Sequence, residues 1–245
     1  MRTGGRRREH AVSAASYFAP ARRRGTEYLD DPNADPVLAL RSLRDIRRSN
    51  RLFGGSAAVL AELRPAFAVA PPGVISLLDV GTGAGDIPAA ARGLAESMGR
   101  ELQTAGLEWT LPLAAAARTQ CVNAVTGDAR HLPFADQSVD FVICSQVLHH
   151  FPDDEATLLL REMHRVARVR VVIGEIRRSW LAAAGLWLAS WPLGFHAVSR
   201  HDGVVSVMRG YLCMELAALV QRSTGAAPTV RNRRGFRVTA SWSPA

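Results

Sequence analysis

The feature that most constrains this chain is an apolar segment that runs directly into a glycine-rich turn and then a helix. Residues 73–80 are apolar and rich in β-branched side chains, which predicts a buried strand. Gly81, Gly83 and Gly85 follow at alternate positions, and residues 86–100 have the composition of a helix. This order lets a backbone approach a ligand closely at the helix N-terminus. The segment therefore predicts a ligand-binding turn in an α/β fold.

Strands and helices alternate after this turn. Further strands are predicted over residues 102–108, 122–126, 138–145 and 169–176, with helices over 111–120 and 153–167. Two helices, 36–53 and 56–70, precede the turn, and a helix over 211–224 is followed by strands near 228–232 and 236–242. Alternation of this kind implies right-handed crossovers and a parallel, doubly wound sheet.

The basic residues of the chain are concentrated at its start. The formal net charge is +8, and residues 1–24 hold seven arginines against one acid, which contributes +6 of it. Such a segment is typical of a disordered tail, and contact with anionic lipid or nucleic acid is the alternative. We expect a basic tail over residues 1–30, a helical cap over 31–72 and the main domain over 73–245.

An apolar stretch over residues 180–198 interrupts the alternation. Its length approaches the ~20 residues that cross a bilayer, but Gly185, Pro192 and Gly194 disfavour a spanning helix. A buried helix is one interpretation. The other is a lid, over about 177–210, that shapes an apolar pocket or rests on a membrane surface, for which tryptophans are suited. The stretch carries them at 180, 187 and 191.

Acidic side chains near the strand ends narrow the ligand class. The chain has no lysine, so a phosphate-binding loop ending in Gly-Lys-Ser/Thr is excluded, and the glycine spacing differs from the dinucleotide fingerprint. Asp79 precedes the turn, where a carboxylate repels phosphate and attracts a cation. Glu108 ends the next strand, where it would hold a ribose diol. Asp128 ends the third strand, where it would accept from an adenine amine.

The cysteines indicate neither a metal site nor disulfides. Cys121, Cys144 and Cys213 are far apart and match no metal-ligand spacing. We therefore expect no metal and a reducing compartment. The N-terminal stretch is too short and too weakly apolar for a secretory signal, so we expect a cytoplasmic protein with a possible peripheral membrane contact through the lid.

These acids and glycines, with "SVDFVICSQVLHHF" at 138–151, resemble the class I S-adenosylmethionine-dependent methyltransferases, in particular the small-molecule branch that includes ubiquinone and menaquinone methyltransferases. The match is firm over residues 74–175. The resemblance implies a Rossmann-like, mostly parallel seven-stranded sheet with N-terminal helices and a helical lid insertion, and S-adenosylmethionine as cofactor. The cofactor residues it implies are Asp79, Gly81, Thr82, Gly83, Gly85, Glu108, Trp109, Asp128, Ala129, Ser145 and Gln146.

Methyl transfer to an oxygen or carbon requires a group that removes a proton from the acceptor. His149 follows the fourth strand, the usual place of the acceptor in this fold. His201 follows the lid beside Asp202, which would orient it or raise its basicity. These histidines are the candidate bases, and Arg51 and Arg200 are candidates for holding an acidic phenol.

The layout around the turn also resembles bacterial methyltransferases of polyketide and phenolic-lipid metabolism. That resemblance implies a small-molecule acceptor and O-methylation of a partly apolar phenol, quinol or polyketide, with C-methylation of a quinone-type ring as the alternative. An RNA methyltransferase would suit the pI of about 10.7. However, no Asn/Asp-Pro-Pro-Tyr/Phe motif follows the fourth strand, so no nucleic-acid partner is expected. A non-catalytic protein that binds S-adenosylmethionine is the remaining alternative.

Overall fold

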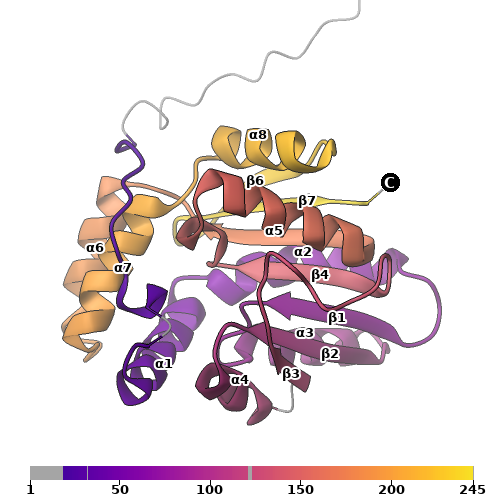
Figure 1. Cartoon of the computed structure of the whole chain (residues 1–245), viewed down its shortest axis with the longest axis horizontal. Coiled ribbons are helices and arrows are strands. Elements are labelled where there is room, and N and C mark those ends of the chain that lie inside the picture. The colour runs from indigo at the N-terminus through magenta and orange to yellow at the C-terminus, as the bar shows by residue number, and fades with distance from the viewer. Residues whose placement is uncertain (1–18, 32, 121–122, 245) are drawn as a thin grey trace, which may run out of the picture.

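A computed structural model describes residues 19–31, 33–120 and 123–244 of the chain (Figure 1). The described residues form one seven-stranded sheet in the order β3-β2-β1-β4-β5-β7-β6. The strands are β1 (Ile75–Val80), β2 (Leu102–Glu108), β3 (Asn123–Thr126), β4 (Val139–Ser145), β5 (Ala167–Ile176), β6 (Thr229–Arg233) and β7 (Arg237–Trp242). Strands β1 to β5 pair in parallel, whereas β7 pairs antiparallel with both neighbours. The predicted mostly parallel, Rossmann-like sheet is confirmed.

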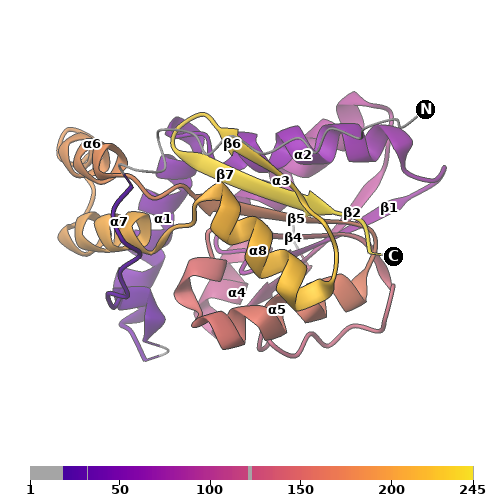
Figure 2. The same ribbon diagram turned by 90° about the horizontal axis from the view of Figure 1, so that it is seen from above.

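Helices cover both faces of the sheet (Figure 2). On one face α2 (Gly55–Val69) and α3 (Asp86–Ser97) bury an apolar core against the strands. On the other face α5 (Asp153–Val166) and α8 (Cys213–Thr224) bury a second core. The amphipathic helix α4 (Leu111–Arg118) packs beside β2 and β3. Because both faces are covered, the central strands are mostly apolar and buried, as in other parallel sheets.

Three further helices form a cap at one end of the sheet, where Figure 1 shows α1 (Pro36–Leu52), α6 (Trp180–Ser190) and α7 (Ala197–Arg209) together. The apolar stretch over residues 180–198 is thus divided between α6 and the start of α7. Ala182 and Ala183 of α6 pack against Val207 and Met208 of α7 in a small separate core. The cap is consequently a packed unit with its own apolar interior.

The end of α1 and the turn of the β6–β7 hairpin lie next to each other. The Asp35 side chain caps α1 by accepting a hydrogen bond from the amide of Val37 at 2.8 Å. Gly54, with φ 76°, makes the sharp turn into α2. Gly235 in the hairpin turn lies so close to the carbonyl of Phe53 that a Cβ atom would not fit. The hairpin turn therefore packs directly on the α1–α2 junction.

Residues 19–31 lie along the cap, a difference from the basic tail predicted over 1–30. Arg22 donates from Nε to the carbonyl of Arg209 at 2.8 Å and pairs with Asp153 at 2.9 Å. Further along, the Glu27 carboxylate is buried and accepts a hydrogen bond from Ser206 at 2.8 Å. This segment belongs to the folded domain, whereas residues 1–18, which carry four of the arginines, lie outside the described residues.

Among the described residues, no individual helix has the length and apolar character needed to cross a bilayer. Two bent pairs reach that length and composition when taken together: α1 with α2, at 60°, and α7 with α8, at 71°.

Candidate active site

The glycine turn lies between β1 and α3, at the carboxyl edge of the sheet. Gly81, Gly83 and Gly85 have φ values of 73°, 55° and 74°, which residues with side chains rarely adopt. A Cβ atom on Gly81 would also collide with Val147. The amide of Gly81 donates to the carbonyl of Leu107 on β2 at 2.8 Å. The turn is therefore fixed beside the crevice between β1 and β4, where the strand order reverses and such folds bind ligands.

Three carboxylates surround the turn: Asp79, Asp86 and Glu108. Asp79 is buried, and its Oδ1 has no hydrogen-bond partner. Burial raises the pKa of Asp79 well above its usual value, and the negative charges of the other two acids raise it further. Burial also raises the pKa of Glu108, which accepts hydrogen bonds from the amides of Gly83 and Trp109. Among the described residues, no basic side chain forms an ion pair with these acids. The site therefore favours a positively charged ligand.

A cavity of about 510 Å³, here called the turn cavity, lies over the glycine turn. Most of the predicted cofactor residues line it: Asp79, Gly81, Thr82, Gly83, Glu108, Trp109, Ala129, Ser145 and Gln146. Trp109 is about half exposed at the rim, where a planar ring could cover a flat ligand. The turn, the acids and the ends of β1, β2 and β4 thus converge on one cavity.

Gly85 and Asp128 do not line the turn cavity. Gly85 is the N-cap residue of α3, and its role in the structure is to start that helix with a left-handed backbone. The Asp128 carboxylate forms a bidentate pair with Arg130, with contacts of 2.9 to 3.1 Å. This pairing and the amide of Arg130 lower the pKa of Asp128. Ala129 and Arg130, its neighbours, do line the cavity.

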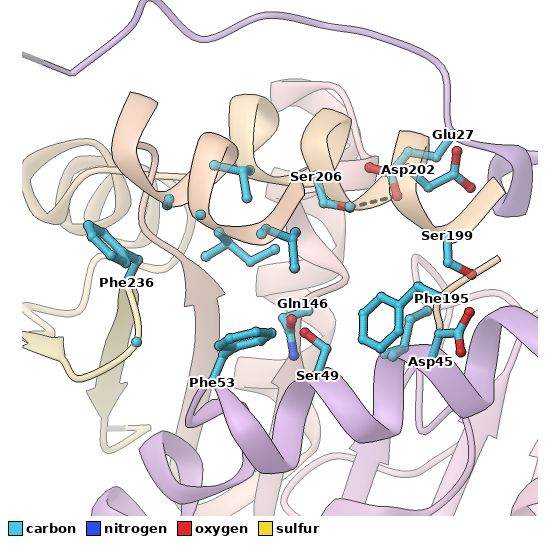
Figure 3. Close-up of a pocket in the computed structure, with 18 of the residues that line it drawn as sticks. Glu27, Asp45, Ser49, Phe53, Gln146, Phe195, Ser199, Asp202, Ser206 and Phe236 are labelled. Atoms are coloured by element: carbon cyan, nitrogen blue, oxygen red, sulfur yellow. Dashed lines mark hydrogen bonds between the residues drawn. The ribbon is translucent and has the colours of Figure 1, made fainter. Parts of the chain in front are cut away.

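A second cavity of about 300 Å³, here called the cap cavity, lies under α6 and α7 (Figure 3). It is enclosed by α1, α6, α7, residues of the 19–31 segment and the hairpin turn between β6 and β7. Its apolar lining includes Phe53, Ile176, Leu186, Phe195, Val207 and Phe236. Its polar lining includes Glu27, Asp45, Ser49, Ser199, Asp202 and Ser206. The cap cavity therefore combines aromatic walls with hydrogen-bond acceptors.

The two cavities share part of their walls. Leu29, Ile46 and Gln146 line both of them. Figure 3 shows Gln146 at the centre of the cap cavity, between the aromatic rings and the serines. The Gln146 side chain donates to Oδ1 of Asn50 on α1, and its backbone amide donates to the carbonyl of Gly174 at 2.7 Å. A ligand in either cavity would thus contact the same residue at the end of β4.

Two non-glycine residues of the cap cavity have left-handed backbones. Gln146 has φ 56° and Phe236 has φ 55°. This conformation costs of order 1–3 kcal/mol and is concentrated at functional sites, where the surrounding structure holds it. Here it directs Gln146 toward the junction of the cavities and Phe236 into the cap cavity.

His149 is buried within an ion-pair network and lines neither cavity. Its Nδ1 lies 2.8 Å from Glu175, and its Nε2 lies 3.6 Å from Glu27. Burial opposes a charge on the imidazole, but the attraction of Glu175 and Glu27 raises the pKa of His149 to about 10. A histidine that stays protonated at neutral pH is a poor base. The geometry gives it a structural part, joining η3 (Leu148–His150) to β5.

His201 also lies outside the two cavities, but its neighbour Asp202 does not. The His201 side chain is 68% exposed, and its Nδ1 lies 2.9 Å from Asp202 Oδ1. Asp202 Oδ2 accepts a hydrogen bond from the amide of Tyr28 at 2.9 Å. Burial raises the pKa of Asp202 although His201 and Tyr28 lower it. This pair connects a carboxylate in the cap cavity with an imidazole in solvent.

Neither arginine predicted to hold a phenol lines a cavity. Arg51 is exposed near the end of α1. Arg200 stacks on Trp191, 4.1 Å from the ring centroid, and donates to the carbonyl of Phe195. The arginine that does line the cap cavity is Arg237, on β7. Arg237 was not predicted because no recognisable motif surrounds it in the sequence. Glu27 was not predicted because it lies in the segment expected to be a tail.

Fold and site together are similar to those of S-adenosylmethionine-dependent methyltransferases. Residues 78–173 match the family model described as a methyltransferase domain, and this segment runs from within β1 to within β5 and holds most of the turn cavity. One solved structure of this fold binds S-adenosylmethionine. Its sulfonium and amino groups suit a turn surrounded by acids, one of which has an unpartnered buried oxygen.

Two curated relatives are named demethylmenaquinone methyltransferases. The chain is 36% identical over 126 residues to a demethylmenaquinone methyltransferase of Roseiflexus sp. (strain RS-1), covering 48% of this chain and 50% of the relative. It is 38% identical over 104 residues to the enzyme of that name from Roseiflexus castenholzii, covering 41% of each chain. The chain thus spans half or less of the length of these relatives.

Solved structures support the fold. A SAM-dependent methyltransferase from Aquifex aeolicus has a TM-score of 0.58 at 17% identity, covering 84% of this chain and 97% of that one. The magnesium protoporphyrin IX methyltransferase of Synechocystis, solved with bound S-adenosylhomocysteine, has a TM-score of 0.51 at 16% identity, covering 77% and 82%.

Proposed function

We propose that this chain is an enzyme that transfers a methyl group from S-adenosylmethionine in the turn cavity to a small, partly apolar acceptor in the cap cavity. The observation that carries this proposal is the shared wall of Leu29, Ile46 and Gln146, which brings the two cavities into contact. A group transfer needs its two reactants side by side and shielded from water. The cap helices cover the cap cavity and so shield the reactants from water.

The residues of the turn cavity fit the cofactor chemically. The backbone of Gly81 and Gly83 would lie against its methionine end, with Asp79 accepting from the amino group. Glu108 would accept from the ribose hydroxyls, and Trp109 and Ala129 would contact the adenine. When bound, the cofactor supplies a methyl group already activated by a sulfonium charge. The protein therefore needs to orient the acceptor and to remove its proton.

Asp202 is the group we assign to proton removal, with His201 as its positioning residue. Asp202 faces the cap cavity and has a raised pKa, so it is more basic than an ordinary aspartate. His201 contacts it at 2.9 Å from the solvent side. A hydroxyl of the acceptor would donate its proton to Asp202. The exposed imidazole of His201 would hold the carboxylate in place and pass the proton on to solvent.

A phenol, quinol or polyketide suits the cap cavity because aromatic side chains and hydrogen-bond acceptors line the same space. Phe53, Phe195 and Phe236 would contact a ring, while the serines and carboxylates would accept from its hydroxyls. O-methylation follows from Asp202 as a base for a hydroxyl. C-methylation of a quinone-type ring is the second candidate, which the demethylmenaquinone methyltransferase relatives favour.

The test begins with cofactor binding. Isothermal titration calorimetry with S-adenosylhomocysteine should show a single site, and the absence of binding would overturn the proposal. Turnover is then measured with S-adenosylmethionine and a set of alkylated phenols and demethylated quinones. Mass spectrometry with NMR of the products distinguishes O-methyl from C-methyl products. Methylation of RNA by protein lacking residues 1–18, with none of the small molecules accepted, would favour the nucleic-acid alternative.

The outer surface of α6 favours a further contact, with an anionic membrane surface. Trp180, Trp187 and Trp191 are each about half exposed, and Leu181 and Leu188 beside them are more exposed. Arg23 and Arg200 lie over two of these rings, at 5.4 and 4.1 Å from the centroids. Exposed tryptophans with adjacent arginines are suited to the interface of an anionic bilayer. Leu181 also lines the cap cavity, so an apolar acceptor could enter there from lipid.

A further inference from the structure

Arg237 carries a buried charge that forms no ion pair with any side chain among the described residues. The residue is 6% exposed, and its Nε has no hydrogen-bond partner. Among the described residues, no carboxylate lies within ion-pair distance of the guanidinium. Buried charges in proteins are normally paired, because an isolated ion loses its hydration without compensation. The Arg237 guanidinium therefore lacks the direct partner that a buried charge normally has.

Glu175, whose charge acts on Arg237, already has other partners. Burial lowers the pKa of Arg237 to about 10 although the attraction of Glu175 raises it, so the guanidinium stays charged at neutral pH. Glu175 accepts from His149 Nδ1 at 2.8 Å, from the His149 amide at 3.2 Å and from the Ile176 amide at 3.0 Å. With its oxygens occupied by these donors, Glu175 does not serve as the direct partner of Arg237.

Arg237 lies where a ligand can reach it. It lines the cap cavity and follows Phe236, whose ring borders the same space (Figure 3). Strand β5 lies between β7, which carries Arg237, and β4, which Gln146 follows directly. The missing partner of the guanidinium would thus be a ligand in the acceptor cavity, close to the wall shared with the turn cavity.

The cap cavity is polarised. In Figure 3, Glu27, Asp45 and Asp202 lie together on one side, opposite Phe53 and Phe236. The acids would accept from a neutral hydroxyl and would repel an anion. Arg237, beside Phe236 in the chain, offers the opposite chemistry. An acceptor with a hydroxyl at one end and an anionic oxygen at the other complements both sides.

We infer that Arg237 binds an anionic oxygen of the methyl acceptor, so that the acceptor is a hydroxyaryl acid or a diphenol ionised at one position. The inference rests on the proposed function, because it assigns the charge of the molecule that the cap cavity holds. A planar guanidinium binds a carboxylate through two parallel hydrogen bonds, which would also orient the aromatic ring. Arg237 is then a specificity-determining residue, distinct from the base Asp202.

The test uses benzoate and benzamide, which have the same shape and differ in charge. Thermal unfolding of the whole chain is measured at pH 7 with each probe at tens of millimolar. Benzoate should raise the melting temperature by about 3 °C and benzamide should not, since a ligand at ten times its Kd adds about 1.4 kcal/mol. Equal effects of the two probes, or no effect of benzoate, would overturn the inference.

Variants of the chain show whether Arg237 is the site at which benzoate raises the melting temperature. Arg237→Met should abolish the benzoate shift without lowering the melting temperature of the free protein, because methionine fills the space without a buried charge. Arg237→Lys should keep part of the shift, and Arg51→Met, which removes an exposed arginine, should keep all of it. A benzoate shift that persists in Arg237→Met would exclude this site. Calorimetry with S-adenosylhomocysteine on the same protein tests the proposed function separately.

Discussion

The side chain of Gln146 donates a hydrogen bond to Oδ1 of Asn50, and this contact joins the end of β4 to α1 at the wall between the two cavities. A Cβ atom on Gly55 would collide with Asn50, so the start of α2 confines the same pair. The left-handed backbone of Gln146 is thus supported from two helices. The wall between the turn cavity and the cap cavity is a fixed part of the fold.

Asp79→Asn should weaken S-adenosylhomocysteine binding about tenfold or more, because the negative charge that would pair with a cationic amino group is lost. Calorimetry at pH 7.5 measures the effect. Asp128→Asn is the matched control, because Asp128 lies beside the turn cavity and is paired with Arg130. We expect the control to bind normally, and equal losses in both variants would return Asp128 to the cofactor site.

The same Asp79→Asn variant should be more stable than the wild type in the absence of ligand at neutral pH. The folded-state pKa of Asp79 lies above its unfolded value of 3.8, so ionisation favours the unfolded chain. Stability is lost as the pH rises from the unfolded pKa to the folded one, and the asparagine variant avoids this loss. Urea unfolding at pH 5 and pH 8 should show a larger advantage of the variant at pH 8.

Asp202→Asn should lower kcat by about 10²- to 10⁴-fold, the usual contribution of a general base. Cofactor affinity should be unchanged, because Asp202 lines the cap cavity and not the turn cavity. In the wild type, kcat/KM should rise with pH as Asp202 ionises. His201→Gln should shift that profile to higher pH, because His201 lowers the pKa of Asp202. An unshifted profile would remove His201 from the mechanism.

His149→Ala should destabilise the fold by about 3–5 kcal/mol, because it leaves Glu175 charged and without its main partner in the core. The folded pKa of about 10 exceeds the unfolded value of 6.5. The stabilisation is therefore complete below pH 6.5 and is lost as the pH rises through about 10. Urea unfolding at pH 6, 8 and 10 measures this trend. A stable variant with its turnover abolished would instead indicate a catalytic part for His149.

Trp187→Ser with Trp191→Ser should reduce binding to anionic vesicles about tenfold or more, because two exposed rings are removed from the outer surface of α6 and from the residue that follows it. Co-sedimentation with phosphatidylglycerol vesicles is compared with phosphatidylcholine vesicles and with Val69→Ser, an exposed apolar control on α2. If the wild type fails to sediment with either vesicle, α6 has no such role.

The sheet and the turn cavity could be predicted from the sequence because their determinants are local. The strand before Gly81, the glycine spacing and the acids at strand ends are all adjacent in the chain to the elements they serve. Parallel strands then bring these ends to one edge, so Asp79 and Glu108 meet without further information.

The cap cavity could not be predicted in the same way, because its residues meet only through tertiary packing. Glu27 comes from a segment whose arginines suggested disorder, yet its carboxylate is buried against His149 and Arg209. For His201 and Asp202, the sequence suggested a histidine oriented by an aspartate. Helix geometry reverses which of them faces the cavity, because adjacent residues on a helix point about 100° apart. The position of Arg237 depends on the antiparallel pairing of β7 with β5, which brings together segments far apart in the chain.

Helix α1 and the 19–31 segment contribute to both cavities, but the rest of the two linings comes from different parts of the chain. The remaining walls of the turn cavity come from the first strands and the loops that follow them, whereas those of the cap cavity come mainly from α6, α7 and the β6–β7 hairpin turn. Under the proposed function, substitutions in this later segment would therefore change which molecule is methylated while the donor site stays intact. Acceptors could then be exchanged by recombining the region after residue 177 among related chains.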